Sequence, residues 1–188
     1  MSGRSDAGEA VEVLDLNPTL RVFADHWTSL PKRDFVPHRC DFRPENLGGA
    51  MTHMVIHELL SPTDIRLRLV GSAIARAYDE DITGRNYLDM VAPERRGAAS
   101  RPFFLACGHP CGMYTRMRSV AWRGLLLGRE SLGFPMRDDT GVRWFYSCST
   151  TESDLEPDFD FDNTGSATVT GVLDRVFLDI GAGVPDGV

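Results

Sequence analysis

Residues 66–93 read RLRLVGSAIARAYDEDITGRNYLDMVAP. The stretch begins as a strand, because apolar side chains alternate with polar ones across residues 65–69 at the period of a half-buried sheet. Ser72 can then cap a short helix over residues 73–78. An acidic loop, a turn that contains glycine and a compact apolar segment follow, and the stretch ends at Pro93. We therefore expect a strand, a helical turn, a polar loop and a second short helix in quick succession.

Three further segments extend this pattern. Residues 132–149, LGFPMRDDTGVRWFYSCS, read as two strands around a D-x-x-G turn. Leu30-Pro31 and residues 38–44, HRCDFRP, lie before the central stretch. With these pieces in place, residues 15–151 resemble a PAS domain, the small bacterial sensor fold, and in particular the stand-alone PAS-like proteins of proteobacteria.

The resemblance implies a fold and a function. The fold is α+β, a five-stranded antiparallel sheet with short helices across one face and an N-terminal helix. The function is that of a sensor or adaptor domain in signal transduction, without catalytic activity, which binds a small, mostly apolar ligand, a signalling protein partner, or both. Neither the ligand nor the partner is identified by the sequence.

The chain divides into three parts under this interpretation. Residues 1–14 are polar and are expected to be disordered. Residues 15–151 form the PAS-like domain, which opens at 15–50 with a helix and an extended connection. Residues 152–188 form an acidic linker and a C-terminal extension, within which residues 171–180 fit either a helix stripe or a strand.

The N-terminal helix is predicted by local signals. Asn17 is a suitable N-cap, and Pro18 suits the first helical position. Leu20, Phe23 and Trp27 follow at helical spacing and form an apolar stripe that needs a surface to cover. We expect the protein to self-associate as a homodimer through this stripe and the outer face of the sheet. The open alternative is that the helix packs on its own domain.

Composition restricts the classes of partner. The chain has 188 residues and a net charge of −7, from 20 basic and 27 acidic residues, which disfavours nucleic acid and anionic membranes as partners. No apolar run approaches the roughly 18 residues of a membrane span. The N-terminus lacks the apolar core of a signal peptide, and the four cysteines are expected to be reduced thiols. The expected location is the cytoplasm.

Metal and cofactor motifs are incomplete. Cys107 and Cys111 flank Gly-His-Pro at a spacing that zinc tolerates, but no second compact ligand pair completes a tetrahedral site. The segment is equally well explained as a turn, so we expect no metal. The Asn-Cys-Arg cluster of flavin-binding PAS domains is missing, and no histidine lies within residues 82–106 to ligate haem. No cofactor is therefore expected.

A ligand in a PAS domain lies between the sheet and the helices that cross it. The resemblance places four candidate ligand-binding residues on the helical side: Tyr87, Met90, Phe103 and Phe104. Six candidates come from the sheet: Tyr114, Met117, Phe134, Trp144, Tyr146 and, as a small wall residue near the sheet centre, Cys148. A one-residue error in register would move a strand's candidates to the other face. All of these side chains could also be ordinary core residues.

Two other functions remain open. A small enzyme of cone-shaped α+β fold, such as an isomerase or dehydratase, would be favoured by a buried acid paired with histidine in the cavity. A ligand-free protein-interaction module would be favoured by a completely filled core. The sequence shows no convincing acid–histidine pair, and a fold alone does not establish a function.

Overall fold

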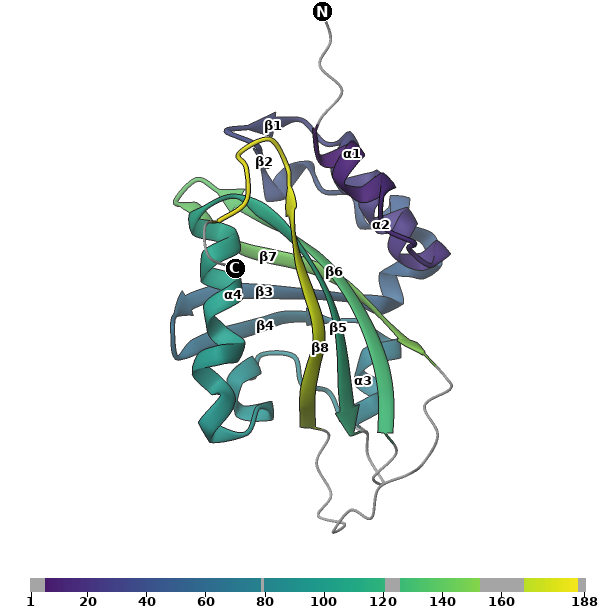
Figure 1. Cartoon of the computed structure of the whole chain (residues 1–188), viewed down its shortest axis with the longest axis vertical. Helices are drawn as coiled ribbons and strands as arrows, with labels where there is room; N and C mark the ends of the chain where they lie inside the picture. Colours follow the sequence, from purple (N-terminus) through teal and green to yellow (C-terminus); the bar gives the residue numbers. More distant parts are fainter. Residues whose placement is uncertain (1–5, 79, 121–125, 153–167, 186–188) are drawn as a thin grey trace, which may run out of the picture.

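The computed structural model describes residues 6–78, 80–120, 126–152 and 168–185. Its centre is a six-stranded antiparallel sheet in the order β4-β3-β7-β6-β5-β8 (Figure 1). The strands are β3 (Met54–Ser61), β4 (Asp64–Val70), β5 (Cys111–Val120), β6 (Leu126–Asp138), β7 (Gly141–Glu152) and β8 (Thr168–Asp179). The α+β fold with an antiparallel sheet is thus confirmed, but the sheet has six strands instead of the expected five.

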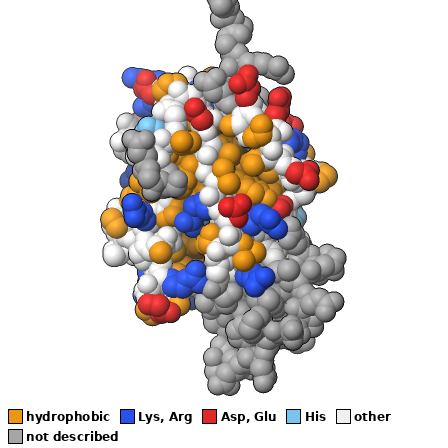
Figure 2. All heavy atoms as spheres, viewed as in Figure 1, with side chains coloured by type: hydrophobic (Ala, Val, Ile, Leu, Met, Phe, Trp, Pro, Cys, Tyr) orange, Lys and Arg blue, Asp and Glu red, His pale blue; other side chains and the backbone are white. Residues whose placement is uncertain are grey.

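The additional strand, β8, decides the question left open at residues 171–180. It pairs with β5 along its whole length, from Cys111 opposite Asp179 to Val120 opposite Thr168. This strand lies in the part of the chain that the sequence assigned to a C-terminal extension. The acidic tract before it falls almost entirely outside the described residues. Because β8 is an edge strand, several of its apolar side chains are partly exposed, and Figure 2 shows hydrophobic side chains along the middle of this face of the molecule, among charged ones.

Helix α2 (Pro18–Ser29) covers one face of the sheet. The Asn17 side chain accepts a hydrogen bond from the backbone N–H of Leu20 (3.1 Å), as the sequence predicted. Trp27 is fully buried and stacks on Phe134 of β6, with ring centroids 4.3 Å apart. The apolar stripe of this helix therefore packs on its own domain. The expectation that the stripe forms a dimer contact is wrong. The sheet of the same chain removes these apolar side chains from solvent, so no second subunit is needed to cover them.

The N-terminal segment is also more ordered than expected. Helix α1 (Asp6–Glu12) buries Ala7 and Val11 in the same core as α2. The Arg21 guanidinium donates hydrogen bonds to the carbonyl oxygens of Val11 (3.3 Å) and Leu14 (3.0 Å). These bonds join the end of α1 to α2, so residues 6–14 pack on the domain. Beyond α2, the connection forms a short ribbon and two 3-10 helices: β1 (Lys32–Arg33), β2 (Val36–Pro37), η1 (Arg39–Asp41) and η2 (Pro44–His53).

The other face of the sheet is crossed by short helices. They are α3 (Ser72–Tyr78), η3 (Tyr87–Met90), η4 (Pro93–Arg95) and α4 (Arg96–Gly108). Pro102 lies inside α4, and the helix continues through it. Proline inside a helix costs about 3 kcal/mol, and here burial of Phe103, Ala106 and Cys107 against the sheet offsets that cost. No helix of the described residues is sufficiently long and apolar to cross a membrane.

Candidate functional site

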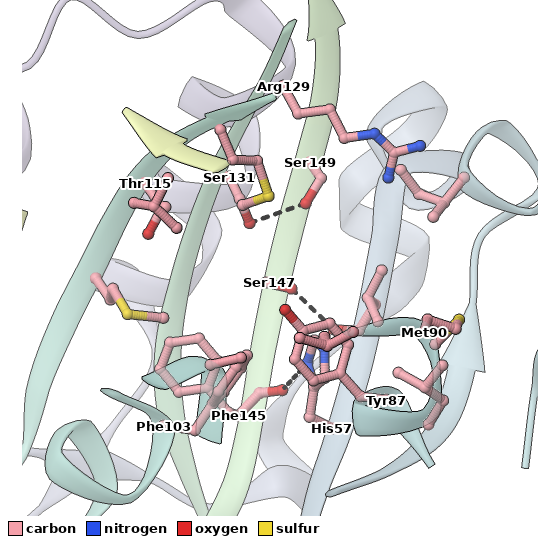
Figure 3. Close-up of a pocket in the computed structure, with 18 of the residues that line it drawn as sticks. His57, Tyr87, Met90, Phe103, Thr115, Arg129, Ser131, Phe145, Ser147 and Ser149 are labelled. Atoms are coloured by element: carbon pink, nitrogen blue, oxygen red, sulfur yellow. Dashed lines mark hydrogen bonds between the residues drawn. The ribbon is translucent and has the colours of Figure 1, made fainter. Parts of the chain in front are cut away.

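A cavity of about 240 Å³ lies between the sheet and the helices α3, η3 and α4 (Figure 3). Most of its wall is apolar. The apolar lining consists of Val55, Leu67, Val70, Ile74, Ile82, Met90, Val91, Ala98, Ala99, Phe103, Met113, Met117, Phe145 and Val172. Polar lining comes from His57, Tyr78, Tyr87, Arg95, Thr115, Arg129, Ser131, Ser147, Ser149 and Arg175. An apolar wall with a few polar groups is the usual composition of a small-molecule site.

On β3, β5, β6 and β7, alternate residues supply the lining. On β7, Phe145, Ser147 and Ser149 face the cavity, while the residues between them face α2 (Figure 3). Both faces of the sheet are covered, so the residues of both faces are shielded from solvent. The strands therefore do not show a simple alternation of polar and apolar residues. Gly133 on β6 gives room for the Phe145 ring, because a Cβ at this glycine would lie 2.2 Å from the ring.

Four of the residues predicted from the sequence line the cavity. Tyr87, Met90 and Phe103 come from the helical side, and Met117 comes from β5. Phe104 is partly buried against the apolar cluster that contains Phe103, but it does not contribute to the cavity wall. The structure thus brings together most of the helical candidates.

The remaining five candidates lie on the opposite face of the sheet. Tyr114, Phe134, Trp144, Tyr146 and Cys148 are buried in the core beneath α2. This corrects their expected placement. Bulky aromatic side chains on these strands fill the tightly packed side, whereas a cavity requires small or withdrawn side chains on its own side. The sequence prediction missed the strand residues that alternate with these five and that line the cavity. The apolar stripe of α2 could have indicated them, because that stripe needs the large strand side chains as its packing surface.

His57 of β3 lies at the aromatic end of the cavity. Its ring is surrounded by those of Tyr87 and Phe103, with centroids 5.7 Å and 4.9 Å away. Its Nδ1 lies 3.2 Å from the carbonyl oxygen of Phe145, so this nitrogen carries the proton and donates it (Figure 3). Burial lowers the pKa of His57 to about 4, against a smaller opposing effect of that hydrogen bond. The imidazole is therefore neutral at pH 7.

Tyr87 is neutral for a related reason. Burial raises the pKa of its phenol to about 12, and Tyr78 adds to this effect. The guanidinium groups of Arg175 and Arg129 lower the same pKa, which places these cations within electrostatic range of the phenol. Neither His57 nor Tyr87 thus contributes a charge to the cavity at neutral pH.

Arg129 is a buried cation in the wall of the cavity. The Arg129 side chain extends from β6 across β7 (Figure 3), is only 7% exposed, and lies with its guanidinium carbon 5.6 Å from the Tyr78 ring centroid. Its Nε has no hydrogen-bond partner among the described residues, and the same holds for Arg175 Nε and Thr115 Oγ1. No aspartate or glutamate occurs among the described residues that line the cavity.

The thiols near the cavity are poorly suited to metal binding. Burial raises the pKa of Cys107 well above its usual range and that of Cys111 to about 12, so both are protonated at neutral pH. Within the described part of the chain, no three His, Cys, Asp or Glu side chains are grouped as a metal site would require. The Cys107–Cys111 segment forms the turn between α4 and β5.

One protein family and a number of solved structures are similar to this chain. The family whose model matches the chain is described as PAS domain, and the match covers residues 16–143. Twenty-four chains of solved structures match, among them the structure of an RNA-binding light-oxygen-voltage receptor. That receptor is 19% identical with a TM-score of 0.43, and the match covers 64% of this chain and 35% of the receptor chain. The chain thus spans about a third of the receptor's length. No curated protein matches.

Proposed function

The chain belongs to the PAS domain family, and from this premise we propose that it is a sensory domain that binds a small, mostly apolar molecule in the cavity. The signal passes to a protein partner by contact. The observation that carries the proposal is the cavity itself, an open volume of about 240 Å³ between the sheet and the helices that cross it. Protein interiors leave few voids larger than a water molecule, so a void of this size with convergent polar groups favours a binding site.

The structure gives less support to an enzyme. An isomerase or dehydratase would need a proton donor and acceptor in the cavity, and a carboxylic acid paired with His57 would be the natural arrangement. Glu58, the sequence neighbour of His57, points away from it and forms ion pairs with Arg68 (2.6 Å) and Arg143 (3.2 Å). His57 itself is held by a backbone carbonyl and by aromatic rings. These contacts support binding without acid–base catalysis.

We also propose that the ligand is a free small molecule and not flavin or haem. The only histidine in the described lining is His57, whose Nδ1 donates to a carbonyl. A cavity of about 240 Å³ lies below the roughly 300–1,000 Å³ of pockets for drug-sized ligands. Both observations support a compact ligand.

Octan-1-ol, a neutral apolar probe, tests the binding site. A ligand that binds only the folded state raises the melting temperature, by about 5–10 °C at a hundredfold excess over Kd for a chain of this size. We expect a saturable increase for the wild-type chain. The Ala99→Phe variant should lose the increase, because Ala99 is a half-buried wall residue that phenylalanine would extend into the cavity.

Ala75→Phe is the matched control. Ala75 lies on α3, is half-buried like Ala99, and does not line the cavity. This variant should respond to octan-1-ol like the wild type. Equal responses of Ala99→Phe and Ala75→Phe would show that the alcohol binds elsewhere. If neither octan-1-ol nor octanoate, the carboxylate of the same chain length, raises the melting temperature of the wild-type chain, the proposed function is contradicted and a ligand-free interaction module is favoured.

A further inference from the structure

One end of the cavity carries a continuous row of polar side chains. Ser149 of β7 lies opposite Ser131 of β6, Ser131 lies opposite Thr115 of β5, and Thr115 lies opposite Arg175 of β8. Directly paired residues of antiparallel strands point to the same face, so the four side chains form one line across four strands. Arg129 is the next inward-facing residue of β6 beyond Ser131. We name these five residues the polar row.

The aromatic residues lie at the other end. In Figure 3, Phe103, Phe145, His57 and Tyr87 lie together at one side, and Thr115, Ser131, Ser149 and Arg129 lie toward the other. The Oγ atoms of Ser131 and Ser149 are 2.8 Å apart and bond to each other. The cavity is therefore polar at one end and apolar at the other, which matches a ligand with a polar head and an apolar body.

The polar row has unused hydrogen-bonding capacity. Arg129 is 7% exposed and Thr115 is 3% exposed, yet Arg129 Nε, Arg175 Nε and Thr115 Oγ1 have no partner within the described part of the chain. Buried polar groups in folded proteins are almost always bonded, and an unpaired buried charge is strongly destabilising. Arginine cannot relieve this by losing its proton. An acceptor that enters the cavity would satisfy these donors.

The charge of the cavity is opposite to that of the chain. The chain has a net charge of −7, whereas the described lining contains three arginines and no acidic residue. His57 and Tyr87 are neutral at pH 7, so they do not offset these cations. Burial lowers the pKa of the Arg175 guanidinium, against a smaller opposing effect of Tyr87.

We propose that the cavity selects an ionised carboxylic acid, with the carboxylate bound by Arg129 and Arg175 and the apolar body packed against the aromatic end. This inference rests on the proposed function, because it assumes that the cavity takes up a ligand. A planar guanidinium presents paired N–H donors that match the two oxygens of a carboxylate. The head is small, as a cavity of about 240 Å³ requires.

Octanoate and octan-1-ol are the probes, because they share an alkyl chain and differ in the charge of the head. Isothermal titration calorimetry on the full chain at pH 7 should show octanoate binding at least about tenfold more tightly, the effect of hydrogen bonds to a charged group. Arg129→Met keeps an unbranched side chain about as long as the arginine stem and removes the charged guanidinium. It should weaken octanoate about tenfold or more and change octan-1-ol binding by less than about twofold.

Arg101→Met is the matched control, since Arg101 is exposed on α4 and lies outside the cavity lining. It removes the same charge and should leave both affinities unchanged. If Arg129→Met proves unstable, the half-buried Arg175→Met tests the same site. Equal binding of the two probes, unaffected by either cavity variant, would overturn the carboxylate assignment and leave the proposed function intact. Absence of binding by both probes would overturn the proposed function and this inference together.

Discussion

His57 illustrates how a single side chain couples the cavity to the stability of the fold. It is buried, neutral and held by the carbonyl oxygen of Phe145. In the unfolded chain its pKa is near 6.5, whereas burial lowers the pKa to about 4 in the folded protein. Between these two values the unfolded state binds a proton that the folded state does not. The free energy of unfolding must therefore decrease as pH falls through this range.

We expect the wild-type chain to lose roughly 3 kcal/mol through His57 as pH falls from about 6.5 to about 4, with the full contribution present above pH 6.5. His57→Gln keeps a donor for the Phe145 carbonyl but does not titrate. Urea unfolding at a series of pH values should show a smaller loss for this variant. Carboxylates titrate alike in both proteins, so identical losses would show that His57 is not responsible.

At the scale of an element, helix α2 determines which face of the sheet is solid. Leu20, Phe23 and Trp27 are all fully buried, and the large side chains of β6 and β7 lie beneath them. Val22 on the same helix is 41% exposed and faces away from the sheet. The helix is thus a fixed part of the domain core, and its apolar face is not available to a second subunit.

Trp27→Glu should therefore unfold the chain and not merely dissociate it. Removing a buried tryptophan costs about 3–5 kcal/mol, and burying a carboxylate adds to that loss. Val22→Glu introduces the same charge at an exposed position of α2 and should change stability by less than about 0.5 kcal/mol. Circular dichroism melting and sedimentation velocity measure the two effects. A folded monomeric Trp27→Glu protein derived from a wild-type dimer would contradict this packing.

Much of this architecture follows from local sequence signals. The Asn17 cap and the D-x-x-G turn are confirmed, since Asp138 Oδ1 accepts a hydrogen bond from the Thr140 backbone N–H (2.8 Å). Other features depend on tertiary partners. Residues 171–180 fit two periods, and pairing with β5 selects the strand. Likewise, packing on the sheet carries α4 through Pro102.

The candidate site was predictable only on its helical side. Tyr87, Met90 and Phe103 belong to short elements that have the sheet on one side, so their direction follows once the fold is known. A strand covered on both faces offers no solvent pattern to identify the faces. Trp144 and Tyr146 of β7 were predicted to line the cavity, but they lie on the packed side of the sheet. The cavity side of this strand carries Phe145 and two small hydroxyl residues, Ser147 and Ser149, which were not among the predicted candidates.

At the scale of the whole molecule, the sheet separates a solid compartment beneath α2 from a compartment that holds the cavity. The cover of the cavity between residues 80 and 104 consists of a loop, the short 3-10 helices η3 and η4 and the first part of α4, and it includes Gly84 and Gly97. Few cooperative contacts hold such a cover, whereas the β6–β7 hairpin is paired on both sides within the sheet. We expect the cover to open more readily than the hairpin.

Hydrogen exchange with mass spectrometry tests this difference. Amides of residues 80–104 should exchange faster than those of residues 133–148 in the free protein. Saturating octanoate should slow exchange in the cover by about tenfold or more and change the hairpin less, because the ligand binds only the closed state. Ala99→Phe should show no such response. Uniform slowing across both segments would indicate global stabilisation without a distinct cover.

The alternating arrangement of β6 and β7 also has an evolutionary consequence. Each residue step along these strands changes compartment, so inserting or deleting one residue would place hydroxyls under α2 and tryptophan or tyrosine in the cavity. Substitutions can tune either compartment separately, and changes of two residues preserve the assignment. Descendants of this gene can therefore diversify what the cavity holds by point mutation, while single-residue changes of length in these strands damage both compartments at once and should be removed by selection.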